Sequence, residues 1–129
     1  MKINTVNHIA INTMHIEESI KFYTEVLNFK LKEKIDIGDC VLVYIEVNKD
    51  TSIELFDLKG ACIDRTPTDE DRGLRHIAFA VEDIAAWNEH LKSKGATFKL
   101  DLCEFTPVKK NIILIEDPDK VVIELCEDI

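Results

Sequence analysis

The stretch RHIAFAVEDI at residues 75–84 repeats a pattern already present in NHIAINTMHI at residues 7–16. Both contain the triplet His-Ile-Ala ahead of a segment with helix-like spacing. A second echo links SIELF at residues 52–56 with VIELC at residues 122–126, and each has a glutamate between two branched apolar residues. Because the period of the repeat is about half of the chain, it indicates a duplicated module rather than a solenoid of many short repeats.

The spacing of the repeated residues supports the duplication. Glu54 follows His8 by 46 positions, and Glu124 follows His76 by 48. A single histidine near a strand start, or a single glutamate within a strand, is most often a solvated or satisfied polar side chain. The chain has only 4 histidines, however, and two of them begin identical triplets with a glutamate at matching distance. The joint repeat therefore favours a functional role.

The size of the chain predicts one domain over residues 1–129. Its 46% hydrophobic content suffices for one good core, and its length is too short for two large independent domains. No apolar run approaches the roughly 20 residues that cross a bilayer, and the first residues lack the apolar segment of a signal peptide. We therefore expect a cytoplasmic protein with no membrane partner.

The formal net charge of −9 argues against nucleic acid as a partner, because that binding depends on Lys and Arg contacts to phosphates. An anionic ligand would need a local basic patch. Candidates are Arg65, Arg72, Arg75, Lys109 and Lys110, although most charged residues are simply solvated. The four cysteines include no Cys-x-x-Cys pair, so they are expected to be free thiols in a reducing compartment.

The first module, about residues 1–58, is predicted to have the order βαβββ. Alternating β-branched residues predict a strand over 4–11, and apolar residues at helical spacing predict a helix over about 15–27. Thr13 is expected to cap this helix and Asn28 to end it. Three further strands are expected over about 29–37, 40–47 and 51–57.

The second module, about residues 74–129, repeats this order after a polar linker over about 59–73. Its helix is expected to begin after Asp83 and to stop at Gly95. The fold class is therefore α+β, with two tandem βαβββ modules. The strands of the second module are expected over about 74–81, 97–102, 111–116 and 120–126.

Side-chain alternation predicts that the repeated residues share one face. Ile53 and Leu55 form an apolar face toward the helix, so Glu54 points to the other side, and the same alternation applies in the second module. If the two modules pack around a shared concavity, four side chains converge there. Two imidazoles and two carboxylates leave one or two open positions on an octahedral divalent ion, as a catalytic metal site needs. The predicted ligands are His8, Glu54, His76 and Glu124, whereas His15 and His90 are expected to be structural.

These motifs resemble the vicinal oxygen chelate superfamily, which contains glyoxalase I, bleomycin-resistance proteins and extradiol dioxygenases. The resemblance covers essentially the whole chain, through HIAINTMHIEESIKFYTEVLNFKL, GLRHIAFAVEDI and IEDPDKVVIELCE. It implies paired modules that form an open, cup-shaped mixed sheet around a divalent metal ion. Nickel, cobalt, manganese, iron and zinc all suit mixed nitrogen and oxygen ligands.

With a glutamate at both carboxylate positions, the ligand set is most similar to that of glyoxalase I, also called lactoylglutathione lyase. This resemblance implies a metal-dependent lyase or isomerase that transfers a proton next to a carbonyl through a metal-held enediolate. The substrate would be a hemithioacetal or a related 2-oxo compound. The resemblance assigns the catalytic base to Glu124, with Glu54 as its counterpart across the metal, and makes His8 and His76 anchoring ligands.

Three positions depart from the glyoxalase I pattern. Asn12 stands where such enzymes usually place an arginine for glutathione, Leu58 where they place an asparagine, and Lys120 where the last hairpin usually has glycine. The alternatives are a CoA-ester epimerase and a metal-free drug-binding or resistance protein of the same fold. A homodimer is also expected, because open sheet edges are usually covered and relatives commonly dimerise. Two arrangements stay open for such a dimer: each site lies within one chain, or each site is built from one half of each chain.

Overall fold

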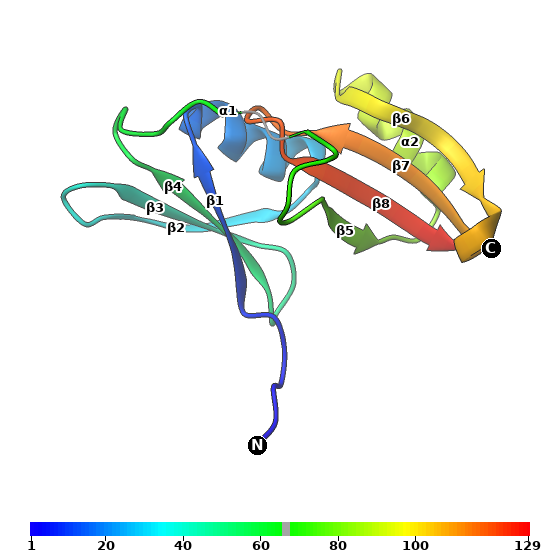
Figure 1. The fold of residues 1–129 in the computed structure, drawn as a ribbon, viewed down its shortest axis with the longest axis horizontal. Coiled ribbons are helices and arrows are strands. Elements are labelled where there is room, and N and C mark those ends of the chain that lie inside the picture. The colour runs from blue at the N-terminus through cyan, green and yellow to red at the C-terminus, as the bar shows by residue number, and fades with distance from the viewer. Residues whose placement is uncertain (66–67) are drawn as a thin grey trace. The chain divides into compact units, whose positions relative to one another are not determined.

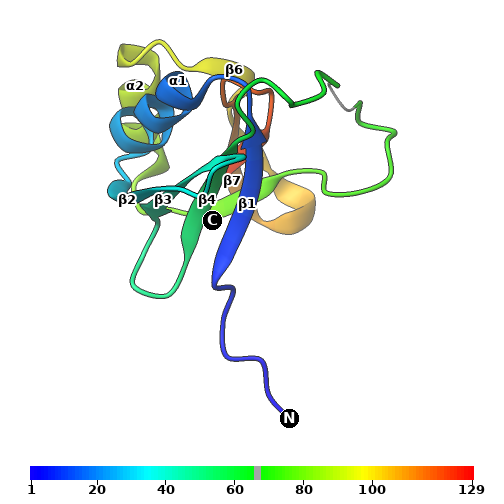
Figure 2. The ribbon, with the colours of Figure 1, turned by 90° about the vertical axis from the view of Figure 1, so that its left-hand side faces the viewer.

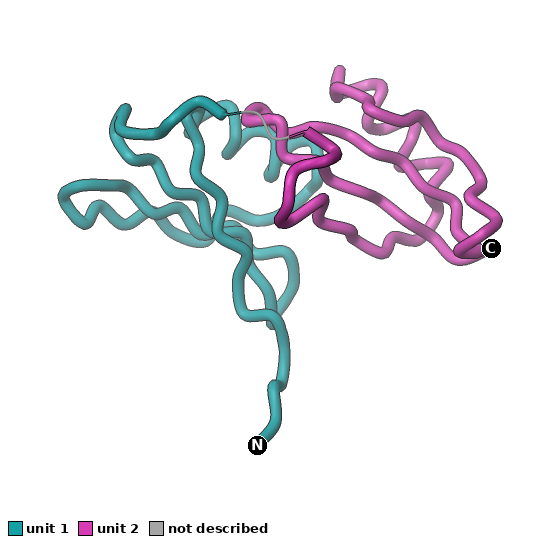
Figure 3. The backbone as a smooth tube through the Cα atoms, in the orientation of Figure 1, with its two compact units in different colours: residues 1–65 teal, residues 66–129 magenta. Residues whose placement is uncertain are grey.

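The computed structural model describes residues 1–65 and 68–129, and the chain divides into two compact units, residues 1–65 and 66–129 (Figure 3). Each unit contains one four-stranded mixed sheet and one main helical segment. This arrangement confirms the predicted α+β fold of two βαβββ modules. No helix among the described residues is long and apolar enough to cross a bilayer.

The sheet of the first unit has the strand order β1-β4-β3-β2 (Figure 1). Strand β1 runs parallel to β4, and the other neighbours are antiparallel. Residues Ile53 and Leu55 are fully buried in β4, as the predicted alternation requires. The strands are β1 (His8–Thr13), β2 (Lys30–Asp36), β3 (Val41–Glu46) and β4 (Ser52–Asp57).

The helix of the first unit confirms the predicted segment, with an unexpected last part. Helix α1 (Ile16–Lys21) continues into a π-helical turn, η1 (Phe22–Val26), and α1 packs on β4. The wider turn arises because the Leu27 N–H donates to the Phe22 carbonyl, 3.1 Å away and five residues earlier. Asn28 then adopts a φ of 58°, which confirms the predicted stop.

Two details of the first module were predicted wrongly. Strand β1 begins at His8 rather than at residue 4, because His8 pairs with the first residue of β4 and the preceding segment leads away from the sheet (Figure 2). Thr13 does not cap α1, because His15 holds the N-cap position. The Thr13 hydroxyl instead accepts a hydrogen bond from the His15 N–H and pairs with the Ser19 hydroxyl, each at 2.9 Å.

The sheet of the second unit has the order β5-β8-β7-β6, with β5 parallel to β8. Helix α2 (Ile84–Ser93) packs on β6, β7 and β8 (Figure 1). Asp83 caps α2 as predicted, since its side chain accepts a hydrogen bond from the Ala86 N–H at 3.0 Å. Gly95 follows with a φ of 68°. The remaining elements are β5 (Ile77–Ala80), β6 (Thr97–Phe105), a 3-10 turn η2 (Thr106–Val108), β7 (Lys110–Glu116) and β8 (Val122–Asp128).

The strand bounds of the second module differ from the predicted ones at three places, and the first of these is β8, which runs over Val122–Asp128 rather than over 120–126. β5 is shorter than predicted, so His76 lies immediately before it. β6 extends to Phe105 rather than to residue 102, because it stays paired with β7 as far as Lys110 through two register shifts. Such irregularities break the side-chain alternation on which the predicted end of the strand depended.

The β7–β8 turn depends on one buried carboxylate, that of Asp117, which is only 3% exposed. Its Oδ1 accepts hydrogen bonds from the Asp119 N–H at 2.9 Å and the Val121 N–H at 2.8 Å. Between them, Lys120 adopts a left-handed conformation with a φ of 68°. The Asp117 side chain therefore satisfies backbone donors that the tight turn leaves without sheet partners.

Asp117→Ala should lower the free energy of unfolding by about 2–3 kcal/mol, because two backbone donors lose a charged acceptor. Asp117→Asn should cost less than half as much, since the amide oxygen can still accept. Urea unfolding of the three proteins measures the difference. An alanine variant within about 0.5 kcal/mol of the original protein would show that the turn does not need this carboxylate.

Candidate metal centre

In the first unit, the parallel pairing of β1 with β4 brings a histidine to a glutamate. Ala10 lies directly opposite Glu54 in the register, and His8, two residues earlier in the strand, projects from the same face. The small alanine side chain leaves the imidazole free to reach the carboxylate. As a result His8 Nε2 lies 3.3 Å from Glu54 Oε2.

The second unit reproduces this arrangement at the equivalent register. Ala78 lies directly opposite Glu124 in the parallel pairing of β5 with β8. His76, two residues before Ala78, places its Nε2 3.2 Å from Glu124 Oε2. The repeated His-Ile-Ala triplet therefore has a physical explanation. Its histidine reaches the glutamate, and its alanine, directly opposite the glutamate, leaves room for that contact.

The chemistry of each pair suits a divalent metal ion. Neighbouring ligand atoms on an octahedral ion with bonds of about 2.1 Å lie about 3 Å apart, which is close to both nitrogen-to-oxygen separations. Glu54 is only 5% exposed, and among the described residues no Lys or Arg forms an ion pair with Glu54 or Glu124. A buried carboxylate needs a compensating partner, and a bound cation would supply one.

Each unit by itself offers half of such a site. Within either unit, the described residues contain no group of three or more His, Cys, Asp or Glu side chains that could hold a metal ion. Four ligands therefore require both histidine–glutamate pairs, and their convergence stays a prediction.

Sequence reasoning missed two neighbours of the first pair. Asn7 Oδ1 lies 2.8 Å from His8 Nδ1, so it can accept a hydrogen bond from the Nδ1–H and leave Nε2 free as a ligand. The Tyr44 hydroxyl donates a hydrogen bond to Glu54 Oε1. That bond, and then burial, raises the pKa of Tyr44. The signal was available, because a hairpin centred on Lys49 places residues 44 and 54 opposite each other.

The second pair has different neighbours. Leu114 occupies the position opposite Glu124 that Tyr44 occupies opposite Glu54. Cys126, two residues after Glu124 on the same face of β8, has its thiol near the Glu124 carboxylate. Burial raises the pKa of the Cys126 thiol, and the nearby Glu124 charge raises it further.

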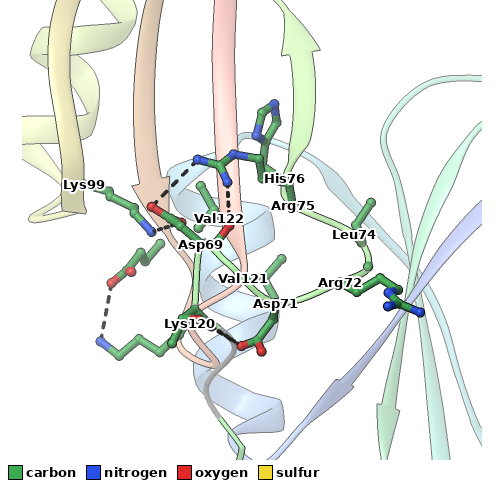
Figure 4. A pocket seen from close by; sticks show the side chains of 13 residues that line it. Asp69, Asp71, Arg72, Leu74, Arg75, His76, Lys99, Lys120, Val121 and Val122 are labelled. Carbon is green, nitrogen blue, oxygen red and sulfur yellow. Dashed lines mark hydrogen bonds and ion pairs between the residues drawn. The ribbon is translucent and has the colours of Figure 1, made fainter.

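A cavity of about 520 Å³ in the second unit has His76 in its wall (Figure 4). Asp69 also lines this cavity; its Oδ1 is 3.2 Å from Lys99 Nζ, and its backbone carbonyl accepts a 2.9 Å hydrogen bond from Arg75. The Lys99 hydrogen bond and charge, with the Arg75 charge, lower the pKa of Asp69. Arg72 points away from this group (Figure 4) and makes no ion pair with the described residues.

The other basic candidates and histidines do not join either pair. Arg65 is exposed, and Lys110 pairs with Asp128, whose hydrogen bond raises the pKa of Lys110. His15 holds the N-cap of α1. His90 packs edge-to-face on Trp87, with 5.5 Å between ring centroids. Lys109 ends η2 in a left-handed conformation.

Comparison with known proteins defines the family. Residues 5–125 match the Glyoxalase/Bleomycin resistance protein/Dioxygenase superfamily. The chain therefore belongs to this superfamily, which confirms the resemblance drawn from the sequence motifs.

Individual relatives cover nearly the whole chain. A probable lactoylglutathione lyase of Synechocystis is 30% identical over 128 residues, which span 93% of this chain and 92% of that protein. The Escherichia coli protein YaeR, described as uncharacterized, is 32% identical over 128 residues and 97% of both chains. The crystal structure of a glyoxalase family protein from Enterococcus faecalis matches with a TM-score of 0.80 at 26% identity, over 98% of this chain and 100% of that one.

Proposed function

We propose that the chain is a metal-dependent lyase or isomerase of the glyoxalase I type, which transfers a proton next to a carbonyl group. The observation that supports this most is the histidine–glutamate pair at the same register in both modules. In this proposal residues 1–129 form one domain, and its two sheets make an open cup in which both pairs bind one divalent ion.

Each ligand has a distinct task in the proposed reaction. The ion would supply Lewis-acid polarisation of substrate oxygens beside the reacting carbon. His8 and His76 would hold the ion through Nε2, and the Glu54 carboxylate would stay bound to the ion throughout the reaction. Glu124 removes the proton from the carbon and returns it to the neighbouring carbon. Acid–base groups of this kind typically contribute about 10²- to 10⁴-fold to the rate.

The substrate is proposed to be a hemithioacetal or a related 2-oxo compound. The charged cavity beside His76 suits a polar substrate. The glutathione pattern is incomplete, because Asn12 in β1 and Leu58 after β4 replace the expected arginine and asparagine. This departure favours a different thiol, and it keeps a CoA-ester epimerase as the alternative. A metal-free drug-binding role has less support, since both histidine–glutamate pairs are intact.

The first prediction from the proposed function is that the protein binds one of nickel, cobalt, manganese, iron or zinc. His76→Ala and Glu54→Ala should each weaken binding by more than about 100-fold, because even outer-shell partners typically contribute about 10- to 100-fold. Equilibrium dialysis against Co²⁺ measures the affinity. His90→Ala is the matched control and should bind like the original protein. Unchanged affinity in His76→Ala would show that the ligands are wrongly assigned.

The second prediction separates the base from the other ligands. Glu124→Gln should keep much of the metal, because an amide oxygen can coordinate, but it should lose about 10²- to 10⁴-fold in turnover, because an amide cannot accept the proton. His8→Ala should lose metal and activity together. Metal content and rate are measured on the same preparation, after a screen of hemithioacetals and CoA esters. If Glu124→Gln turns over normally with metal in place, Glu54 becomes the candidate base.

The third prediction is a homodimer at micromolar concentration. Strands β1, β2, β5 and β6 end the two sheets and leave open edges. All of β2 is exposed, including the apolar side chains of Leu31 and Ile35. Sedimentation equilibrium measures the assembly, and a purely monomeric protein would contradict the prediction.

Mixed dimers test whether each site takes one module from each chain. His8→Ala and His76→Ala chains, unfolded together and refolded, form some dimers with one chain of each kind. If the sites are shared between chains, one of the two sites in every mixed dimer is intact, so Co²⁺ binding returns. If each site lies within one chain, every site lacks one histidine, and binding does not return.

A further inference from the structure

The two glutamates have the same place in their modules but different neighbours on the adjoining strand. Tyr44 lies directly opposite Glu54, and its hydroxyl donates to Glu54 Oε1. The equivalent position opposite Glu124 holds Leu114, whose side chain has no hydrogen-bond donor. The duplication that makes the histidine–glutamate pairs alike therefore does not extend to the third strand.

The tyrosine restrains a carboxylate that is already held at its other oxygen. Glu54 Oε2 faces His8, and Oε1 accepts a hydrogen bond from the Tyr44 hydroxyl. Directly opposed residues on adjacent strands have neighbouring Cβ atoms, so the Tyr44 ring reaches the carboxylate without leaving the sheet surface. A hydrogen bond to an ionised acceptor is roughly twice as strong as one between neutral groups. Rotation of the Glu54 side chain would break this bond.

Glu124 is held less firmly. One oxygen faces His76, and the side chain near it on β8 is the Cys126 thiol, which is at best a weak donor. The Glu124 side chain is also more exposed, at 15% against 7% for Glu54. A carboxylate with these neighbours can change its orientation at lower cost.

We propose that Tyr44 is a positioning residue that fixes Glu54 as a permanent metal ligand, whereas Glu124, opposite Leu114, is the carboxylate free to move. This inference rests on the proposed function, because it needs a metal ion for Glu54 to bind. In this proposal the two glutamates have different roles because a single cross-strand contact, between Tyr44 and Glu54, is present in one module and absent from the other.

A double-mutant cycle on Co²⁺ affinity tests the proposal. Tyr44→Phe should weaken binding by about 10-fold or more, as loss of an outer-shell partner typically does. The same change should have its full effect in the Glu124→Gln background. In the Glu54→Gln background it should cost less than about 3-fold, because the ionised acceptor is already gone. A merely structural role of the hydroxyl would give equal losses in all three backgrounds and would overturn the proposal.

Tyr23→Phe is the matched control, because it removes the hydroxyl of the other tyrosine in the chain. Tyr23 is fully buried in η1, so this change tests whether any lost tyrosine hydroxyl weakens metal binding through stability alone. It should leave the Co²⁺ affinity unchanged. A loss equal to that of Tyr44→Phe would contradict the positioning role.

A second measurement uses the metal-free protein. The Cζ resonance of ¹³C-labelled tyrosine reports the hydrogen bond of each of the 2 tyrosines, and Tyr44→Phe assigns them. Glu54→Gln should shift the Tyr44 signal, and Glu124→Gln should not. If Glu54→Gln leaves the Cζ chemical shift of Tyr44 unchanged, the inference is overturned.

The outcomes separate this inference from the proposed function. If the original protein binds Co²⁺ and Tyr44→Phe binds it equally well, the role of Tyr44 is refuted and the proposed function stands. If the original protein binds none of the divalent ions, both are refuted, whatever the tyrosine resonance shows.

Discussion

The parallel pairing of the first strand with the last strand of each module is the constraint on which the candidate site depends. In a hairpin the partner of a residue is set by the local turn, but β1 and β4 are joined only through the rest of the module. Their register places Ala10 opposite Glu54, and therefore His8 within reach of the carboxylate. A shift by one residue would turn every side chain of β1 to the other face and separate the pair.

The sequence was sufficient to predict the fold and the two histidine–glutamate pairs. Both depend on residue spacing, side-chain alternation and internal repetition, which are readable along one chain. The error at the start of β1 occurred where a distant residue decides the outcome, whereas the error at Thr13 is local. The start of β1 is set by the start of β4, and the Thr13 hydroxyl serves the turn before α1 rather than the N-cap. Whether the pairs meet depends on the packing of whole modules, which local patterns do not specify.

Tyr44 illustrates the same distinction at the level of one side chain. Alternation predicts that a tyrosine in β3 faces either the helix or the open side, but not which residue it touches. That requires the hairpin register, in which Tyr44 pairs with Glu54. The corresponding register in the second module puts Leu114 opposite Glu124. A repeat can therefore preserve its ligands while the residues beside them differ, and the two copies of one motif then need not do the same work.

The electrostatics of Glu54 connect the metal site to the stability of the fold. This carboxylate is buried, and among the described residues its polar neighbours are a phenol and an imidazole rather than a Lys or Arg. Neither neighbour carries the permanent positive charge of a Lys or Arg, so a bound cation would be a stronger partner for Glu54 than either of them. A divalent ion that binds the folded chain and not the unfolded one would stabilise the fold in proportion to the logarithm of its concentration. The same burial that makes Glu54 costly in the metal-free chain thus strengthens its attraction for a cation, because the field of a carboxylate is less screened there than in water.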